Sequence, residues 1–113
     1  MPHIVIEHSK GLDASHDLQA LCDDLWESFA AHHSVNGPDT VRVRTIAATA
    51  GRIGVEPQSF AHATLLLLPG RSEETRTELA RMTLDTLEAH LPDVGSLTVR
   101  LTDLNQPYLK RML

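Results

Sequence analysis

Hydrophobic and polar residues alternate in four short stretches of the chain, and this alternation predicts four β-strands. We expect these strands over residues 2–8, 40–47, 60–68 and 97–102. The third stretch ends in Leu65-Leu66-Leu67-Leu68, which is apolar on both faces of a strand. A strand of that kind is typical of a central position in a sheet, with cover on each side.

Two longer segments repeat their apolar residues with the period of an α-helix. The first extends from Asp13 to His33, and its apolar positions are Leu18, Leu21, Cys22, Leu25, Trp26 and Phe29. We expect all six to pack in the core. The second begins at Ser72, a favourable N-cap residue followed by two glutamates, and extends to about Leu91 before Pro92 stops it.

The order of these elements predicts an α+β fold made of two βαβ units. The halves, about 1–56 and 57–113, carry the same pattern without visible sequence identity, and together they form one predicted domain. Because each helix has one apolar face, both should pack on one face of a single four-stranded sheet. The other face then needs cover, so we expect the chain to form an oligomer.

The composition narrows the range of functions. Hydrophobic residues make up 42% of the 113 residues, no apolar run is long enough to span a membrane, and the start of the chain predicts no secretory signal. The net charge of −5 argues against a general affinity for nucleic acid. A single cysteine, Cys22, forms no internal disulfide and is consistent with a reducing compartment, so we expect a cytoplasmic protein.

Pro2 is the first candidate for chemistry. Removal of Met1 would leave Pro2 with a free secondary amine, whose pKa falls if burial and neighbouring cations disfavour the ammonium form. A neutral amine can transfer a proton as a general base. If Met1 stays in place, Pro2 is a tertiary amide without a basic lone pair, and its presence at the second position has no chemical meaning.

Three arginines are candidates for binding an anion. Arg42 and Arg44 share one face of the second predicted strand, and Arg71 lies at the start of the second predicted helix. A guanidinium binds a carboxylate through two parallel hydrogen bonds, and backbone donors at a helix N-terminus also favour anions. Taken alone, these residues are better explained as a solvated strand face, for Arg42 and Arg44, and as a surface turn, for Arg71.

Seven histidines raise the question of a metal site. No pair of them has the i, i+4 spacing that two ligands on one helix require, and the single cysteine adds nothing. The sequence therefore predicts no metal site. His3 follows Pro2 and has no assigned role beyond a place on the strand face.

The chain resembles the 5-carboxymethyl-2-hydroxymuconate isomerase family of the tautomerase superfamily. The resemblance lies in the order and spacing of three segments: Met1-Pro2-His3-Ile4-Val5-Ile6-Glu7, Val41-Arg42-Val43-Arg44 and Pro69-Gly70-Arg71-Ser72. The family implies a homotrimer with its sheets facing inward, no cofactor, and a small carboxylate substrate from the degradation of aromatic acids. It also implies an amino-terminal proline that moves a proton in an unsaturated 2-hydroxy acid.

Carried over by position, the resemblance assigns Pro2 as the catalytic base and Arg42 and Arg71 as substrate-binding residues. The role of Arg44 is left open. Two other functions stay open at this stage. One is a catalytically silent trimer of the same fold, and the other is a ferredoxin-like module that binds a small ligand without converting it.

Overall fold

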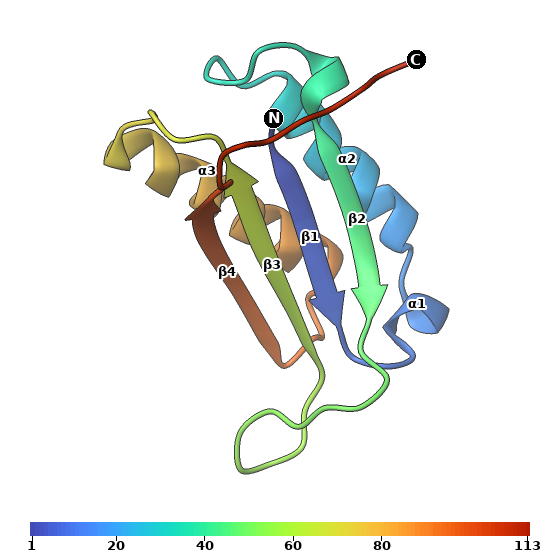
Figure 1. The fold of residues 1–113 in the computed structure, drawn as a ribbon. Helices are drawn as coiled ribbons and strands as arrows, with labels where there is room; N and C mark the ends of the chain where they lie inside the picture. Colours follow the sequence, from blue (N-terminus) through green and yellow to red (C-terminus); the bar gives the residue numbers. More distant parts are fainter.

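The computed structural model describes residues 1–113 and contains one four-stranded sheet of order β2-β1-β3-β4 (Figure 1). The first strand pairs in parallel with the second and antiparallel with the third, which in turn pairs in parallel with the fourth. Two βαβ units thus share one mixed sheet, as predicted, and the strand with the leucine run is central. The strands are β1 (His3–His8), β2 (Arg42–Ala47), β3 (Phe60–Leu67) and β4 (Ser96–Asp103).

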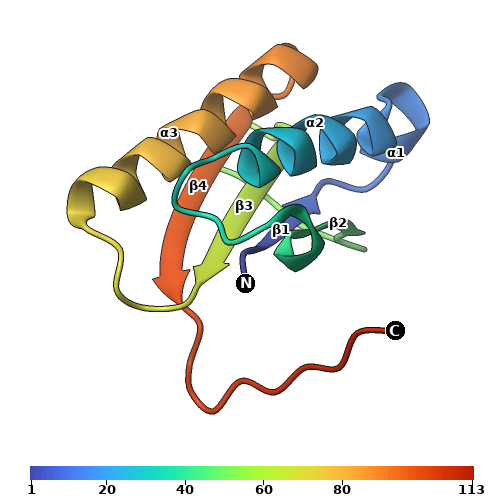
Figure 2. The same cartoon turned by 90° about the horizontal axis from the view of Figure 1, so that it is seen from above.

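The helices α2 (Leu18–Ala30) and α3 (Glu73–His90) lie side by side on one face of the sheet (Figure 2). Ser72 caps α3 as predicted, because its side chain accepts a hydrogen bond from the amide of Thr75. The first helix differs from its prediction. It begins at Leu18, after the N-cap Asp17, and residues before it form only the short helix α1 (Leu12–Ser15).

The core lies between the helices and the sheet. Leu21, Leu25 and Phe29 of α2 are fully buried there, opposite inward-facing residues of the two central strands such as Ile4 and Leu65. The prediction that every apolar residue of this helix packs in the core is wrong for two residues at the edge of the apolar stripe. Trp26 is 38% exposed and Cys22 is half-buried, because the helix rests on the sheet through a narrower stripe than the sequence suggested.

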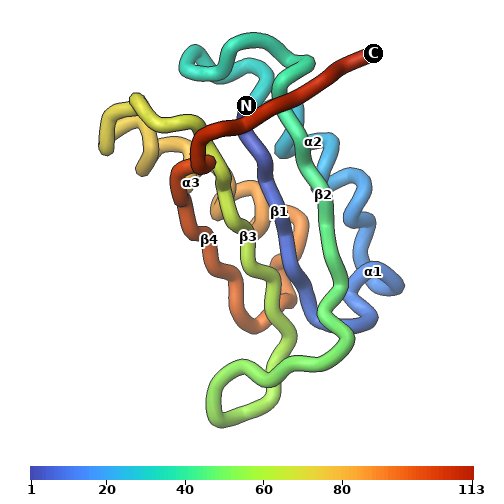
Figure 3. Tube along the Cα trace, viewed as in Figure 1, coloured from blue at the N-terminus to red at the C-terminus, as the bar shows by residue number.

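The opposite face of the sheet carries no helix (Figure 2). Alternate residues of the strands point to it, among them Val5, Arg44, Thr64 and Leu66. The last ten residues run along one end of this face instead of covering it (Figures 2 and 3). Among the helices of the chain, none is both long enough and apolar enough to cross a membrane.

Candidate active site at the start of the first strand

The topology brings four distant segments to one end of the sheet. The parallel strands β1 and β2 both start there, and β3 and β4 both end there (Figure 1). Pro2 lies immediately before β1, is buried, and accepts a hydrogen bond of 3.0 Å from the backbone amide of Arg42. The connection after β3 carries Arg71, and the segment after β4 returns across the same end (Figure 3).

The amino group of the chain lies among positive charges. Burial lowers the pKa of the Met1 amine, and the neighbouring charges of Arg71, Lys110 and Arg42 lower it further. Lys110 also contacts Met1, with its Nζ 3.3 Å from the sulfur atom. None of these three cations forms an ion pair with a carboxylate. The site therefore has uncompensated positive charge, which favours an anionic ligand and a neutral amine.

Arg71 is held in place by carbonyl and hydroxyl groups. Its Nη2 donates to the carbonyl of Ser34 at 2.9 Å, its Nε donates to Ser34 Oγ at 3.3 Å, and its Nη1 donates to the carbonyl of Leu68 at 3.3 Å. Burial lowers the pKa of this guanidinium, which nevertheless stays charged because arginine does not deprotonate in proteins. Its partners fix the orientation of Arg71 and leave its charge available to a substrate.

Arg42 is oriented in a similar way. Its Nη1 donates to the carbonyl of Thr40 at 3.1 Å, and its Nη2 lies 3.1 Å from the sulfur of Met112 in the last segment. A thioether is a weak acceptor, so a carboxylate can replace it with a gain in hydrogen-bond strength. Arg42 thus has one firm anchor and one donor that an anion can take.

Arg44 and His3 form a separate chain of hydrogen bonds. Arg44 Nη1 donates to His3 Nδ1 at 3.2 Å, and His3 Nε2 lies 2.9 Å from the hydroxyl of Tyr108. Because a guanidinium only donates, Nδ1 accepts and the neutral ring carries its proton on Nε2. Burial lowers the pKa of His3, as do Arg44, Arg42 and the amino terminus. The lowered pKa favours the neutral form of His3 beside the site.

The structure thus brings Pro2, Arg42 and Arg71 to the same end of the sheet. Sequence reasoning missed Lys110 and Tyr108, which reach the site from the last segment. Residues 104–113 have no periodic pattern and form no helix or strand, so no signal in the sequence could place them against the first strand.

A single chain does not enclose this site. The largest surface groove, of about 460 Å³, lies between α2 and the outer edge of β2, and Pro2 lines none of the grooves in the structure. Of Pro2, Arg42 and Arg71, only Arg42 borders this groove. It is lined by Gln19, Cys22, Asp23, Trp26, Val41, Arg42, Val43 and Arg44.

The sequence model of the 5-carboxymethyl-2-hydroxymuconate isomerase family matches residues 2–102. The chain belongs to this family. The predicted enzyme class, an isomerase with the tautomerase fold, is thereby confirmed. The matched segment includes Pro2, Arg42 and Arg71 and ends before Lys110 and Tyr108.

Solved structures agree with the fold. A 5-carboxymethyl-2-hydroxymuconate delta-isomerase superposes with a TM-score of 0.82 at 21% identity, over 99% of this chain and 88% of that one. A 5-carboxymethyl-2-hydroxymuconate isomerase from Deinococcus radiodurans R1 gives 0.83 at 21%, over 97% and 88%. A fused 4-OT described as a wild-type symmetric trimer gives 0.74 at 19%, over 95% and 89%. A comparison with curated proteins finds no match.

Proposed function

We propose that the chain is a cofactor-free isomerase that moves a proton within a small unsaturated 2-hydroxy di- or tricarboxylate. The substrate is 5-carboxymethyl-2-hydroxymuconate or a close analogue from the degradation of aromatic acids. Membership of the family supports this reaction class. The observation that carries the proposal is the group of three cations without a carboxylate partner around the start of the chain, where burial and these charges lower the pKa of the Met1 amine, one residue before Pro2.

In this proposal Pro2 is the base once Met1 has been removed. The lone pair of its secondary amine accepts a proton from the substrate and returns one to a different atom, so the reaction consumes no proton overall. Pro2 is buried, and the cations that lower the pKa of the Met1 amine would act in the same direction on a Pro2 amine one residue further along the chain.

Arg42 and Arg71 bind the substrate's carboxylates and face the negative charge that develops on the 2-oxygen during proton transfer. Donors that are already oriented stabilise that charge without reorganising at the moment of reaction. The hydrogen bonds from Arg71 to Ser34 and Leu68, and from Arg42 to Thr40, support this role because they fix both guanidinium groups beforehand.

The active form in this proposal is a homotrimer. Two observations support an assembly: the helix-free face of the sheet, and a site that one chain leaves open. The fused 4-OT of the same fold is a symmetric trimer. A neighbouring copy packed on the bare face would exclude water from the amine and its cations.

The test uses a chain with a removable amino-terminal extension that a protease cleaves directly before Pro2. Ketonisation of a 2-hydroxymuconate-type dienol is followed by absorbance before and after cleavage, and the uncleaved chain serves as its own control. We expect activity to appear on cleavage and to collapse in Pro2→Ala. Equal rates before and after cleavage would refute Pro2 as the base, and an inactive cleaved trimer would indicate the silent alternative.

A further inference from the structure

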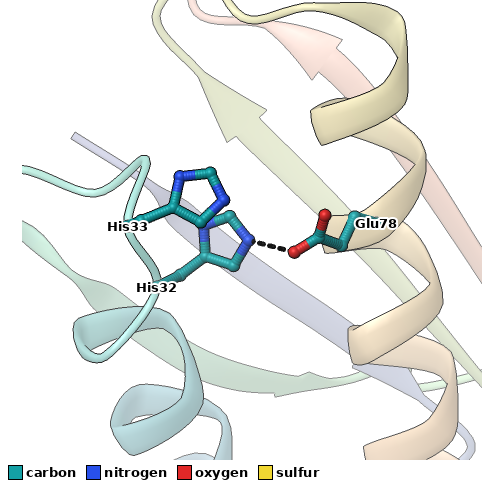
Figure 4. Close-up of side chains that lie close together, drawn as sticks. All are labelled: His32, His33 and Glu78. Carbon is teal, nitrogen blue, oxygen red and sulfur yellow. Dashed lines mark hydrogen bonds and ion pairs between the residues drawn. The ribbon is translucent and has the colours of Figure 1, made fainter.

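Two histidines in the turn after α2 and one glutamate of α3 form a cluster that the proposed reaction does not use (Figure 4). His32 Nε2 lies 2.7 Å from Glu78 Oε1, and the ring of His33 stacks on that of His32 with 4.4 Å between centroids. One ligand atom from each of the three residues lies within 4.8 Å of the others. No other group of three histidine, cysteine or carboxylate side chains in the chain meets this condition.

We propose that His32, His33 and Glu78 bind a divalent metal ion of the zinc class. Two imidazole nitrogens and one carboxylate oxygen are the donors that Zn²⁺ and Co²⁺ accept in tetrahedral sites, with water in the fourth position. The two rings are inclined by only 28°, and Figure 4 shows them one above the other with Glu78 projecting toward them from the facing helix. Because an imidazole lone pair lies in the plane of its ring, binding requires the exposed His33 ring to turn toward the ion, together with a shift of the exposed Glu78 carboxylate.

The surroundings of His32 suit a metal ligand. Its side chain is 7% exposed, so the ring is held by packing and directs Nε2 outward to Glu78. A metal on Nε2 requires the ring proton on Nδ1, and Ser34 Oγ, 2.8 Å from Nδ1, can accept the hydrogen bond that this N–H donates. A hydrogen-bonded partner on the second ring nitrogen is a regular feature of metal-bound histidine. In this tautomer Nδ1 carries a proton and no longer accepts the hydrogen bond from the backbone amide of Ser34.

The ion would act as a structural link. His32 and His33 belong to the turn after α2, whereas Glu78 lies in the second turn of α3, so one ion ties the two helices together at this end. The turn also contains Ser34, whose carbonyl and hydroxyl hold Arg71. Metal binding thus steadies the segment that orients a proposed substrate-binding residue, although the metal site itself does not depend on the proposed reaction.

The simpler interpretation is a histidine–carboxylate hydrogen bond and nothing more. The chain offers a matched comparison, because His90 Nε2 lies 2.8 Å from Asp24 Oδ2 across the same pair of helices. That pair has no third ligand. His90→Ala therefore removes a histidine of similar setting without touching the proposed metal site.

The test is titration of the untagged, full-length protein with ZnCl₂, followed by calorimetry, together with the visible absorption of the Co²⁺ form. We expect one ion per chain, d–d bands typical of four-coordinate Co²⁺, and a rise in the midpoint of thermal unfolding with Zn²⁺. Glu78→Gln retains an acceptor for His32, and His33→Ala leaves the His32 bond intact. Each should weaken zinc affinity by roughly tenfold or more, because a tetrahedral ion loses a protein ligand.

His90→Ala should bind zinc like the unchanged protein. Absence of stoichiometric binding in the unchanged protein would overturn the proposal. Equal losses of zinc affinity in His90→Ala and Glu78→Gln would also overturn it, because zinc would then bind to separate surface histidines and not to the proposed cluster. Dienol ketonisation plays no part in these readouts, so a failure of the metal site and a failure of the proposed reaction are separate outcomes.

Discussion

Lys110 adds positive charge to the site from outside the segment that matches the family. Its charge is the second of the cationic contributions, after Arg71, that lower the pKa of the Met1 amino group, one residue before Pro2. Arg111, the next residue, is exposed and makes no side-chain hydrogen bond. The two residues therefore allow the charge near the amine to be separated from the charge of the chain as a whole.

Lys110→Ala should move the acidic limb of the pH profile of kcat/KM to higher pH. Loss of a nearby cation raises the pKa of the amine, so the neutral base forms only at higher pH. The measurement is dienol ketonisation as a function of pH at constant ionic strength. Arg111→Ala should leave the limb in place, and an identical limb in both variants would contradict the role given to Lys110.

For single residues, the sequence predicted which residues form the candidate site better than it predicted the contacts that orient them. Pro2, Arg42 and Arg71 were identifiable because they lie in segments with recognisable order and spacing. The contacts that orient Arg71 were not, because Ser34 belongs to an irregular turn 37 residues earlier in the chain. Glu78 was missed beside the His32-His33 pair for the same reason, since only the packing of α3 on α2 brings it there.

At the scale of elements, α2 shows where the helical pattern misled. Its apolar stripe predicted equal burial for Leu25 and Trp26, but Leu25 is fully buried and Trp26 is 38% exposed beside the groove at β2. The residue pattern fixes which side of a helix is apolar, whereas the tilt of the helix on the sheet decides which edge of that stripe reaches the core.

Leu25→Ala should lower the free energy of unfolding by about 2–5 kcal/mol, the range for removing a buried leucine and leaving a cavity. Trp26→Ala should cost clearly less, although it removes more atoms, because much of the indole is already in contact with water. Urea unfolding of both variants measures the difference. If Trp26→Ala lost more unfolding free energy than Leu25→Ala, Trp26 would belong to the core, as the helical pattern of the sequence predicted.

The break between α1 and α2 also differs from the predicted continuous helix. Asp17 caps α2, and the preceding His16 turns away to bond Asp93, which follows α3, with 2.7 Å between His16 Nε2 and Asp93 Oδ1. The hydrogen bond to Asp93 raises the pKa of His16, and the same bond lowers the pKa of Asp93. This pair links the start of one helix to the end of the other.

The His16–Asp93 pair should stabilise the fold within a limited pH range. Because the pKa of His16 is raised by folding, its contribution to stability is complete below the pKa of the unfolded state. It is lost as pH rises through the pKa of the folded state. A lowered aspartate pKa gives stability that is lost as pH falls through its folded value. The contribution is therefore greatest between roughly pH 4 and pH 6.5.

Chemical unfolding of the unchanged protein and of Asp93→Asn at several pH values tests this expectation. The difference in unfolding free energy should be largest within that range and should shrink above it. A difference that stays constant from acidic to alkaline pH would show that the pair acts through packing and not through charge.

At the scale of the whole molecule, the two faces of the sheet are unequal. The helices cover one face (Figure 2). Val5 and Thr64, paired on the two central strands, lie on the other. This asymmetry followed from the sequence, because only two helical segments with one apolar face each were available to cover a sheet. The path of residues 104–113 could not be predicted from the sequence, because it depends on single contacts such as the hydrogen bond between Tyr108 and His3.

Val5→Lys should dissociate the proposed trimer, because it places a charge in the middle of the face that neighbouring copies would bury. Analytical ultracentrifugation should give a trimer for the unchanged protein and a smaller species for the variant. Glu74→Lys, on the exposed first turn of α3, is the control and should stay trimeric. An unchanged protein that sediments as a monomer would contradict the assembly.

The most direct measurement is an NMR titration of the Pro2 nitrogen in mature protein labelled with ¹⁵N-proline. We expect a titrating amine whose pKa lies below that of a free prolyl amine and coincides with the acidic limb of kcat/KM. A Pro2 nitrogen that does not titrate, or one that titrates at the free prolyl value, would contradict this expectation.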